Sequence, residues 1–316
     1  MKKCIIVSLD GTVDWDVYLN LKAFYRRCGY NIAFSTRPYN SDLLVIMRGS
    51  SNKVYKKIKC ECHIYDYVKN GTDLTIKSFP NSKKIKLISL DQIGLDTLCN
   101  DVEKIFSPHP VLVEIWDDDK RYEKIYDMVH IGHRKKVELI SDKKIEQFQK
   151  FAKTGILKLY GKGWDEIDNL NSEGPTSLFK SNMIYKKSRS AVGSMHPYQR
   201  GKTISGRFWQ APINGCFLYS ESLPDNFNPP GVIQVNDYFQ ILNLKIGDSR
   251  TVAIEAKKFW NKVTVDLATN LDLSYDQNIN IKYALLWHHI LVSLGMQRIY
   301  IGFERRLTRI LNKFDN

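Results

Sequence analysis

Residues 126–136 read Tyr-Asp-Met-Val-His-Ile-Gly-His-Arg-Lys-Lys, an apolar stretch that runs into a glycine and then a cluster of positive charges. This pattern predicts a buried strand over Tyr126–Ile131, followed by a loop that leads into a basic helix. A loop in this position presents unpaired backbone N–H groups, which bind anions at the start of the helix. Gly132, His133 and Arg134 are therefore candidate phosphate ligands, with an ordinary surface loop as the alternative.

The order of strand, loop and helix continues after this stretch. The expected strands are Ile156–Tyr160, Ala191–Met195, Cys216–Ser220 and Gly231–Val235, and the expected helices are Asp142–Ala152, Ser177–Lys187, a turn at Gly206–Gln210, Thr251–Leu267 and Ile281–Leu294. Alternation of this kind is typical of a parallel sheet built from βαβ units.

The first third of the chain has the same rhythm. Strands are expected at Cys4–Leu9, Asn31–Ser35, Asp42–Met47, His63–Val68 and Ile85–Leu90, with a helix at Val17–Cys28. The pattern breaks near residues 107–121, where prolines and an acidic run occur. The sequence thus predicts an α/β protein with a domain at 1–112, a second domain at 113–280 and a basic helical segment at 281–316.

Length and composition limit the class of protein. The chain has 316 residues, 43% of them hydrophobic, and its formal net charge is +13. It contains no apolar run of the roughly 18–20 residues that cross a bilayer. We therefore expect a cytoplasmic globular protein, with six cysteines that are mostly buried free thiols. The charge is uneven, with 19 basic and 9 acidic residues over 120–207 but 5 basic and 8 acidic over 208–280. Such a field attracts phosphates, nucleic acid or anionic lipid.

Two further segments carry candidate binding residues. Gly161 follows the expected strand Ile156–Tyr160, and a glycine there lets the backbone approach a ligand closely. In a helical turn at Gly206–Gln210, Arg207 and Gln210 share one face. Arg207 would then fork onto a diphosphate, and Gln210 would bond ribose hydroxyls. The alternatives are a simple turn at Gly161 and a surface position for Arg207.

Taken in order, these three segments resemble the donor-binding domain of spore-maturation-type glycosyltransferases, which have two Rossmann-like domains facing across a cleft (the GT-B type). More distantly, they resemble phage DNA β-glucosyltransferases. The resemblance covers roughly residues 110–240, and the first third matches only in its sheet rhythm. It implies an enzyme that transfers a sugar from a nucleoside-diphosphate donor to an acceptor hydroxyl.

The resemblance also implies roles for single residues. Arg134 and Arg207 would hold the diphosphate, and Gly132 would allow its close approach. Apart from the resemblance, His133 in the same loop is a candidate contact to a phosphate or the sugar, with an ordinary loop histidine as the alternative. Gln210 falls where these families usually carry a glutamate that grips the ribose diol. An amide there loses the charge-assisted strength of that contact, which leaves a non-catalytic nucleotide- or glycan-binding protein as an alternative.

An inverting transferase needs a base on the acceptor hydroxyl. The loop after the first expected strand faces the ligand edge of a parallel sheet, and Asp10 in that loop is the predicted base. The nearby Asp14 and Asp16 have helix capping as their alternative. Asp117–Asp119 is the nearest approach to a metal-binding DxD pair. It is interpreted as a solvated acidic turn, so no obligatory metal is expected.

Three kinds of partner are compatible with the sequence besides a nucleotide sugar. The first, which is the leading expectation for the acceptor, is a bacterial surface glycan or its lipid-linked precursor, with the basic C-terminal segment docking at the inner face of an anionic membrane. The second is duplex DNA, which the charge of +13 also suits. The third is a nucleotide or a glycan that a non-catalytic protein of the same fold binds without transferring a sugar.

Overall fold

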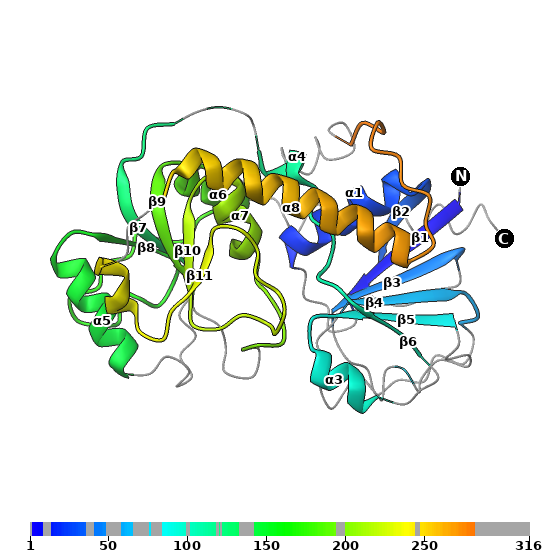
Figure 1. Cartoon of the computed structure of the whole chain (residues 1–316), viewed down its shortest axis with the longest axis horizontal. Coiled ribbons are helices and arrows are strands. Elements are labelled where there is room, and N and C mark those ends of the chain that lie inside the picture. Colours follow the sequence, from blue (N-terminus) through cyan, green and yellow to red (C-terminus); the bar gives the residue numbers. More distant parts are fainter. Residues whose placement is uncertain are drawn as a thin grey trace. The chain divides into compact units, whose positions relative to one another are not determined.

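The computed structural model describes residues 2–8, 14–35, 41–48, 58–65, 76, 84–98, 102–117, 120, 122–132, 142–193, 200–243 and 247–281. They divide into two units, shown in Figure 1: Met1–Leu112 with the residues from Asn261 on, and Val113–Trp260. The second domain was predicted to run to residue 280, whereas the described residues from Asn261 to Ile281 belong to unit 1. Thr264 holds this segment to unit 1, because its hydroxyl accepts a hydrogen bond from the Val111 N–H and donates one to the Val111 C=O.

Unit 1 is built on a parallel sheet of six strands in the order β2-β1-β3-β4-β5-β6. The strands are β1 (Lys2–Ser8), β2 (Tyr30–Ser35), β3 (Leu43–Arg48), β4 (Glu61–Tyr65), β5 (Ile85–Ser89) and β6 (Glu103–Phe106), with helices α1 (Trp15–Arg27) and α3 (Gln92–Thr97). The inner strands are buried along most of their length, as expected of a parallel sheet covered on both faces.

A polar network centred on His63 lies in unit 1. His63 on β4 is fully buried, with Nδ1 2.7 Å from the Tyr25 hydroxyl and Nε2 3.0 Å from Glu61 Oε1. The Tyr25 hydroxyl also lies 2.8 Å from that of Tyr65. The carboxylate only accepts, so His63 Nε2 donates to it and Nδ1 accepts from Tyr25. Burial lowers the pKa of His63, which favours this neutral form.

Lys86 ties this sheet to the chain beyond Asn261. Its ammonium donates to the Leu271 carbonyl and to Asp272 Oδ2, both at 3.1 Å. It also lies 3.7 Å from Glu103 on the neighbouring strand β6. A largely buried lysine thus has its charge matched within its own unit.

Unit 2 is built on a second parallel sheet, in the order β11-β10-β9-β7-β8. Its strands are β7 (Tyr126–Ile131), β8 (Leu157–Tyr160), β9 (Ser188–Gly193), β10 (Phe217–Ser220) and β11 (Val232–Gln234). Its helices are α4 (Val113–Trp116), α5 (Asp142–Lys153), α6 (Leu178–Lys186), α7 (Arg207–Ile213), the 3₁₀ helix η3 (Tyr238–Asn243) and the first half of α8 (Ser249–Asn270). Two successive parallel sheets with helices confirm the predicted fold class.

The end of α7 depends on Gly215. Gly215 has φ of +67°, a left-handed conformation that favours glycine after a helix. A Cβ there would lie 2.6 Å from the Ser249 carbonyl oxygen. The Lys124 ammonium donates to the Asn214 and Gly215 carbonyls at 3.2 and 2.9 Å. These contacts hold the C-terminal end of α7 against the rest of unit 2. They bear on the site because Arg207 is the first residue of this helix.

Asp117 differs from its prediction. The acidic run was interpreted as a solvated turn, but only 10% of the Asp117 side chain is exposed, and it forms ion pairs with Lys186 and Lys257. Its partners are distant in sequence, which is why a local reading assigned the charge to solvent. Asp118 and Asp119 lie outside the described residues.

None of the described helices is both long and apolar enough to span a bilayer. The five described cysteines, Cys4, Cys28, Cys60, Cys62 and Cys216, are free thiols.

Candidate functional site

The strand order of unit 2 marks one position for a ligand. The chain runs from β7 outward to β8, then returns to β9 on the other side of β7 and continues to β10 and β11. Ligands of doubly wound sheets bind outside the carboxyl ends of the strands where the order reverses. Here the order reverses between β7 and β9, so that position lies at the carboxyl ends of these two strands. Gly132 directly follows β7, and Gly193 is the last residue of β9.

Arg207 reaches this position from the start of α7. A Cβ built on Gly193 would lie 3.3 Å from Arg207 Cδ, and a Cβ on Gly132 would lie 3.1 Å from Arg207 Nη2. The arginine side chain therefore passes Gly193 and places its guanidinium beside Gly132. Both glycines leave the space that this side chain occupies, so their lack of a Cβ has a direct steric reason.

His130 approaches the same point from β7. Its ring is 2% exposed and packs against Phe148 and Trp164, with ring centroids 5.2 and 5.0 Å away. Nδ1 lies 2.9 Å from the Val192 carbonyl oxygen. Nε2 lies 3.2 Å from the place a Cβ on Gly132 would take.

The backbone of Gly132 is held on both sides. Its N–H donates to the Tyr160 carbonyl at 2.9 Å, and its own carbonyl accepts the indole N–H of Trp164 at 2.8 Å. The peptide after β7 is thus fixed before any ligand arrives, which makes the position a rigid one.

A second group of charges lies at the ends of β9 and β10. Glu221 follows β10 and pairs with Arg200 at 3.0 Å. The Tyr238 hydroxyl donates to the Gly193 carbonyl at 2.6 Å. Burial raises the pKa of Tyr238, the Glu221 carboxylate adds to that rise, and the Arg207 and Arg200 guanidinium groups oppose it. Two arginines and one carboxylate therefore act on the same tyrosine.

The predicted site residues fall into three groups. Gly132 and Arg207 come together at the point described above, and Gly161 stands at the end of the neighbouring strand β8, where its N–H donates to Gly174. Gln210 lies on α7 with Arg207, but only 5% of it is exposed. Its role toward a ribose stays a prediction. Asp10, His133 and Arg134 lie outside the described residues.

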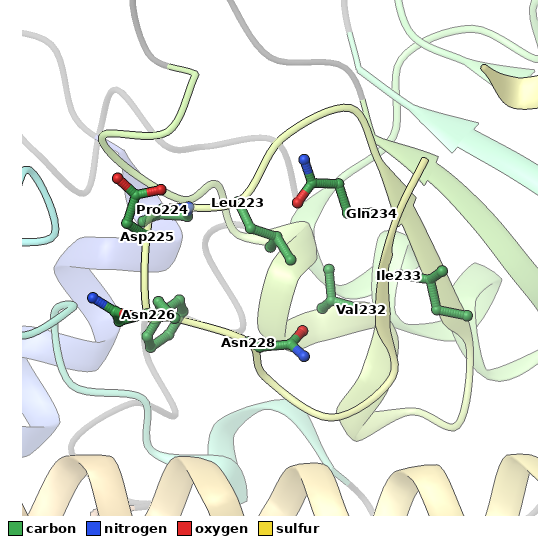
Figure 2. Close-up of a pocket in the computed structure, with 9 residues that line it drawn as sticks. Leu223, Pro224, Asp225, Asn226, Asn228, Val232, Ile233 and Gln234 are labelled. Carbon is green, nitrogen blue, oxygen red and sulfur yellow. The ribbon is translucent and has the colours of Figure 1, made fainter. Parts of the chain in front are cut away.

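A cavity of about 710 Å³ lies beside the edge strand β11. It is lined by the loop Leu223–Asn228 and by the three residues of β11. Figure 2 shows the Val232 side chain pointing into this space and Ile233 lying on the opposite side of the strand. Of the described residues that line it, none is a lysine or an arginine, so its chemistry differs from that around Arg207.

Sequence reasoning missed His130, Gly193 and Glu221 as members of the site. Two signals were present in the sequence. His130 lies within the run Met-Val-His-Ile of β7 and is a polar group that needs a partner once it is buried. Glu221 directly follows β10 and lies at the ligand edge of the sheet. Neither signal shows that Arg207, far along the chain, would complete the group.

Comparisons with known proteins identify the fold. The chain is similar to solved structures of the DNA-modifying enzyme β-glucosyltransferase (15% identity, TM-score 0.53, 85% of this chain and 97% of that chain). It is also similar to T4 phage β-glucosyltransferase in complex with UDP-glucose (12% identity, TM-score 0.52, 86% and 100%). A third is AviGT4, a glycosyltransferase of avilamycin A biosynthesis (11% identity, TM-score 0.52, 85% and 97%).

At these identities the likeness shows the fold, which is that of GT-B glycosyltransferases. No protein-family model and no curated protein matches the sequence. The part of the predicted resemblance that concerns spore-maturation-type enzymes therefore stays a prediction.

Proposed function

We propose that this chain is a glycosyltransferase that takes a sugar from a nucleoside-diphosphate donor bound at the carboxyl edge of the unit 2 sheet. The observation that carries the proposal is the position of Arg207, whose guanidinium lies beside Gly132 where the strand order reverses. The solved structures with the same fold include one in complex with UDP-glucose. Uridine diphosphate is therefore the first nucleotide to test.

The chemistry of transfer gives Arg207 a role beyond binding. As the bond from the anomeric carbon to the donor breaks, negative charge develops on the leaving diphosphate. A fixed guanidinium beside that group stabilises the developing charge. Arg207 would act in this way from unit 2, and Arg134 would add a second positive charge if it occupies its predicted place. The assignment of Asp10 as base stays a prediction.

The donor site is tested by the thermal midpoint of unfolding in the presence of uridine, guanosine, cytidine and thymidine diphosphates. A ligand that binds only the folded protein at about 100 times its Kd adds roughly 2.7 kcal/mol, which raises the midpoint by several degrees or less. We expect one diphosphate to raise the midpoint of the wild type and to lose this effect in Arg207→Ala.

A matched control is Arg189→Ala. Arg189 lies on β9 in the same unit, but 57% of its side chain is exposed and its partner is the surface residue Asp127. This variant should respond to the diphosphate as the wild type does. If no diphosphate stabilises the wild type, or if both arginine variants lose the response equally, the donor-site assignment is wrong.

Duplex DNA is the acceptor that we propose for a second experiment. The support is the net charge of +13 and the likeness to a DNA-modifying glucosyltransferase over nearly the whole of that protein. Binding of random-sequence duplex, followed by fluorescence anisotropy between 50 and 200 mM salt, should weaken steeply with salt. If the protein does not bind the duplex even at the lower salt, the surface glycan or lipid-linked acceptor becomes the candidate to test.

A further inference from the structure

His130 shares with Arg207 the small space in front of Gly132. The imidazole Nε2 and the guanidinium Nη2 lie 3.2 and 3.1 Å from the single point that a Cβ of Gly132 would occupy. His130 reaches that point from β7 and Arg207 from α7. The two groups therefore border the same point in front of Gly132, at the sheet edge where we propose that the donor phosphates bind.

The protonation of the His130 ring follows from its other contact. Nδ1 lies 2.9 Å from the Val192 carbonyl oxygen, and a carbonyl oxygen only accepts hydrogen bonds. Nδ1 therefore carries a hydrogen. In the neutral ring this leaves the lone pair on Nε2, the atom that faces Gly132. A guanidinium has five N–H donors and no acceptor, so the two groups are complementary.

The ring has little freedom to turn away. His130 is 2% exposed, and its ring packs against those of Phe148 and Trp164, with the Trp164 ring nearly perpendicular to it at 80°. The Trp164 indole N–H also bonds the Gly132 carbonyl. The direction of Nε2 is thus set by packing and by the bond to Val192, independently of Arg207.

We propose that His130 is a positioning residue for Arg207, with Nε2 accepting a hydrogen bond from the guanidinium and holding it toward the donor diphosphate. This inference rests on the proposed function, because it assigns His130 a part in the same site. His130 acts through Arg207 and takes no part in bond making or breaking. Its effect is to reduce the freedom that the arginine must lose on binding.

Two substitutions separate this role from a merely structural one. In His130→Asn the amide nitrogen takes the place of Nδ1 and keeps a donor toward Val192, but nothing reaches Gly132. In His130→Gln the longer side chain brings an amide oxygen to the place of Nε2, which keeps an acceptor for Arg207. Binding of uridine diphosphate to the full-length protein is measured by isothermal titration calorimetry, with the thermal midpoint recorded for each variant.

We expect His130→Asn to bind the diphosphate about tenfold more weakly than the wild type, and His130→Gln to stay within about threefold. The inference is overturned if His130→Asn binds as the wild type does. It is equally overturned if both variants lose the same affinity, or if only the glutamine variant loses it.

A second measurement decides the case in which the wild type binds no diphosphate, which would refute the proposed function. Thermal midpoints of the ligand-free wild type, His130→Asn, Arg207→Met and the double variant form a double-mutant cycle. Paired side chains should make the two losses non-additive, with the double variant shifted less than the sum of the single shifts. Additive shifts would overturn the pairing whatever the function of the protein is.

Discussion

The two buried histidines His63 and His130 occupy comparable places in different sheets and have different surroundings. Each stands on a parallel strand, and each has one ring nitrogen fixed by an oxygen that only accepts, Glu61 for the first and Val192 for the second. In His63 the other nitrogen bonds the Tyr25 hydroxyl, which continues to Tyr65. In His130 the other nitrogen faces Gly132, where Arg207 arrives.

This difference separates a structural network from a functional one. The network of His63 stays within unit 1, through Tyr25, Tyr65 and Glu61, so we expect it to contribute to the stability of that unit. The group around His130 ends at a guanidinium next to a glycine at the carboxyl edge of the sheet, where we propose that the donor diphosphate binds. Substitutions in the first network should therefore change stability, and substitutions in the second should change binding.

The largest expected effect is on donor binding in Gly132→Ala. The new Cβ would lie 3.1 Å from Arg207 Nη2 and 3.2 Å from His130 Nε2, closer than ordinary van der Waals contact. The flexible arginine would move away, and the affinity for the diphosphate should fall about a hundredfold, equivalent to roughly 3 kcal/mol. Calorimetry measures the loss.

The matched control for this variant is Gly247→Ala. Its Cβ would be equally crowded, 3.1 Å from Phe217 Cζ, but the crowding involves neither Arg207 nor His130. It should keep the affinity of the wild type. Equal affinity losses in the two alanine variants would mean that crowding in unit 2, and not the space before Gly132, controls binding.

The next effect is on stability in His63→Leu. The substitution removes the acceptor of the Tyr25 hydroxyl and the donor to Glu61. Leaving a buried hydroxyl with fewer partners should lower the free energy of unfolding by about 2–3 kcal/mol, as measured by urea denaturation. The affinity for the diphosphate should stay unchanged, and a parallel loss of affinity would contradict the separation of the two networks.

The smallest expected effect is on the pH dependence of stability. Burial lowers the pKa of His63, so below about pH 6.5 the unfolded chain binds a proton that the folded chain does not. The stabilisation that His63 contributes is therefore complete above about pH 6.5, and it is lost as the pH falls toward the pKa of His63 in the folded protein. The pKa of Glu61 is also lowered, by the hydrogen bond from His63, which extends the loss to lower pH.

His63→Gln isolates that contribution, because glutamine keeps hydrogen-bonding groups but does not titrate. Between pH 7.5 and pH 5 the wild type should lose on the order of 1 kcal/mol more than this variant. Urea denaturation at the two pH values measures the difference. Equal losses in both proteins would show that His63 does not titrate differently on folding.

The fold was predictable because its signal is local. Strand β3 begins with five buried apolar residues, Leu-Leu-Val-Ile-Met, and such a run indicates a parallel sheet without knowledge of its partners. Strand β6 was missed because it is an edge strand whose sequence, Glu-Lys-Ile-Phe, has two charged residues among four. An edge strand needs less burial, and its pattern is correspondingly weak.

The site was predictable only in part because its geometry is not local. The strand and glycine at 126–132 and the Arg207 helix could each be recognised, but their meeting at one point depends on the order of the strands. The same limit explains Asp117, whose partners Lys186 and Lys257 are far along the chain. The charge and hydrogen-bonding groups of a side chain follow from its residue type, whereas its partners depend on which residues the fold brings beside it.

The indole of Trp164 has a consequence for observing this site. It donates to the carbonyl of Gly132 and lies edge-on to the His130 ring, and an indole's emission depends on the local electric field and on nearby quenching groups. Trp164 is therefore an intrinsic fluorophore beside the proposed phosphate position. The difference between the emission of the wild type and of Trp164→Phe reports occupancy of that position without an added label.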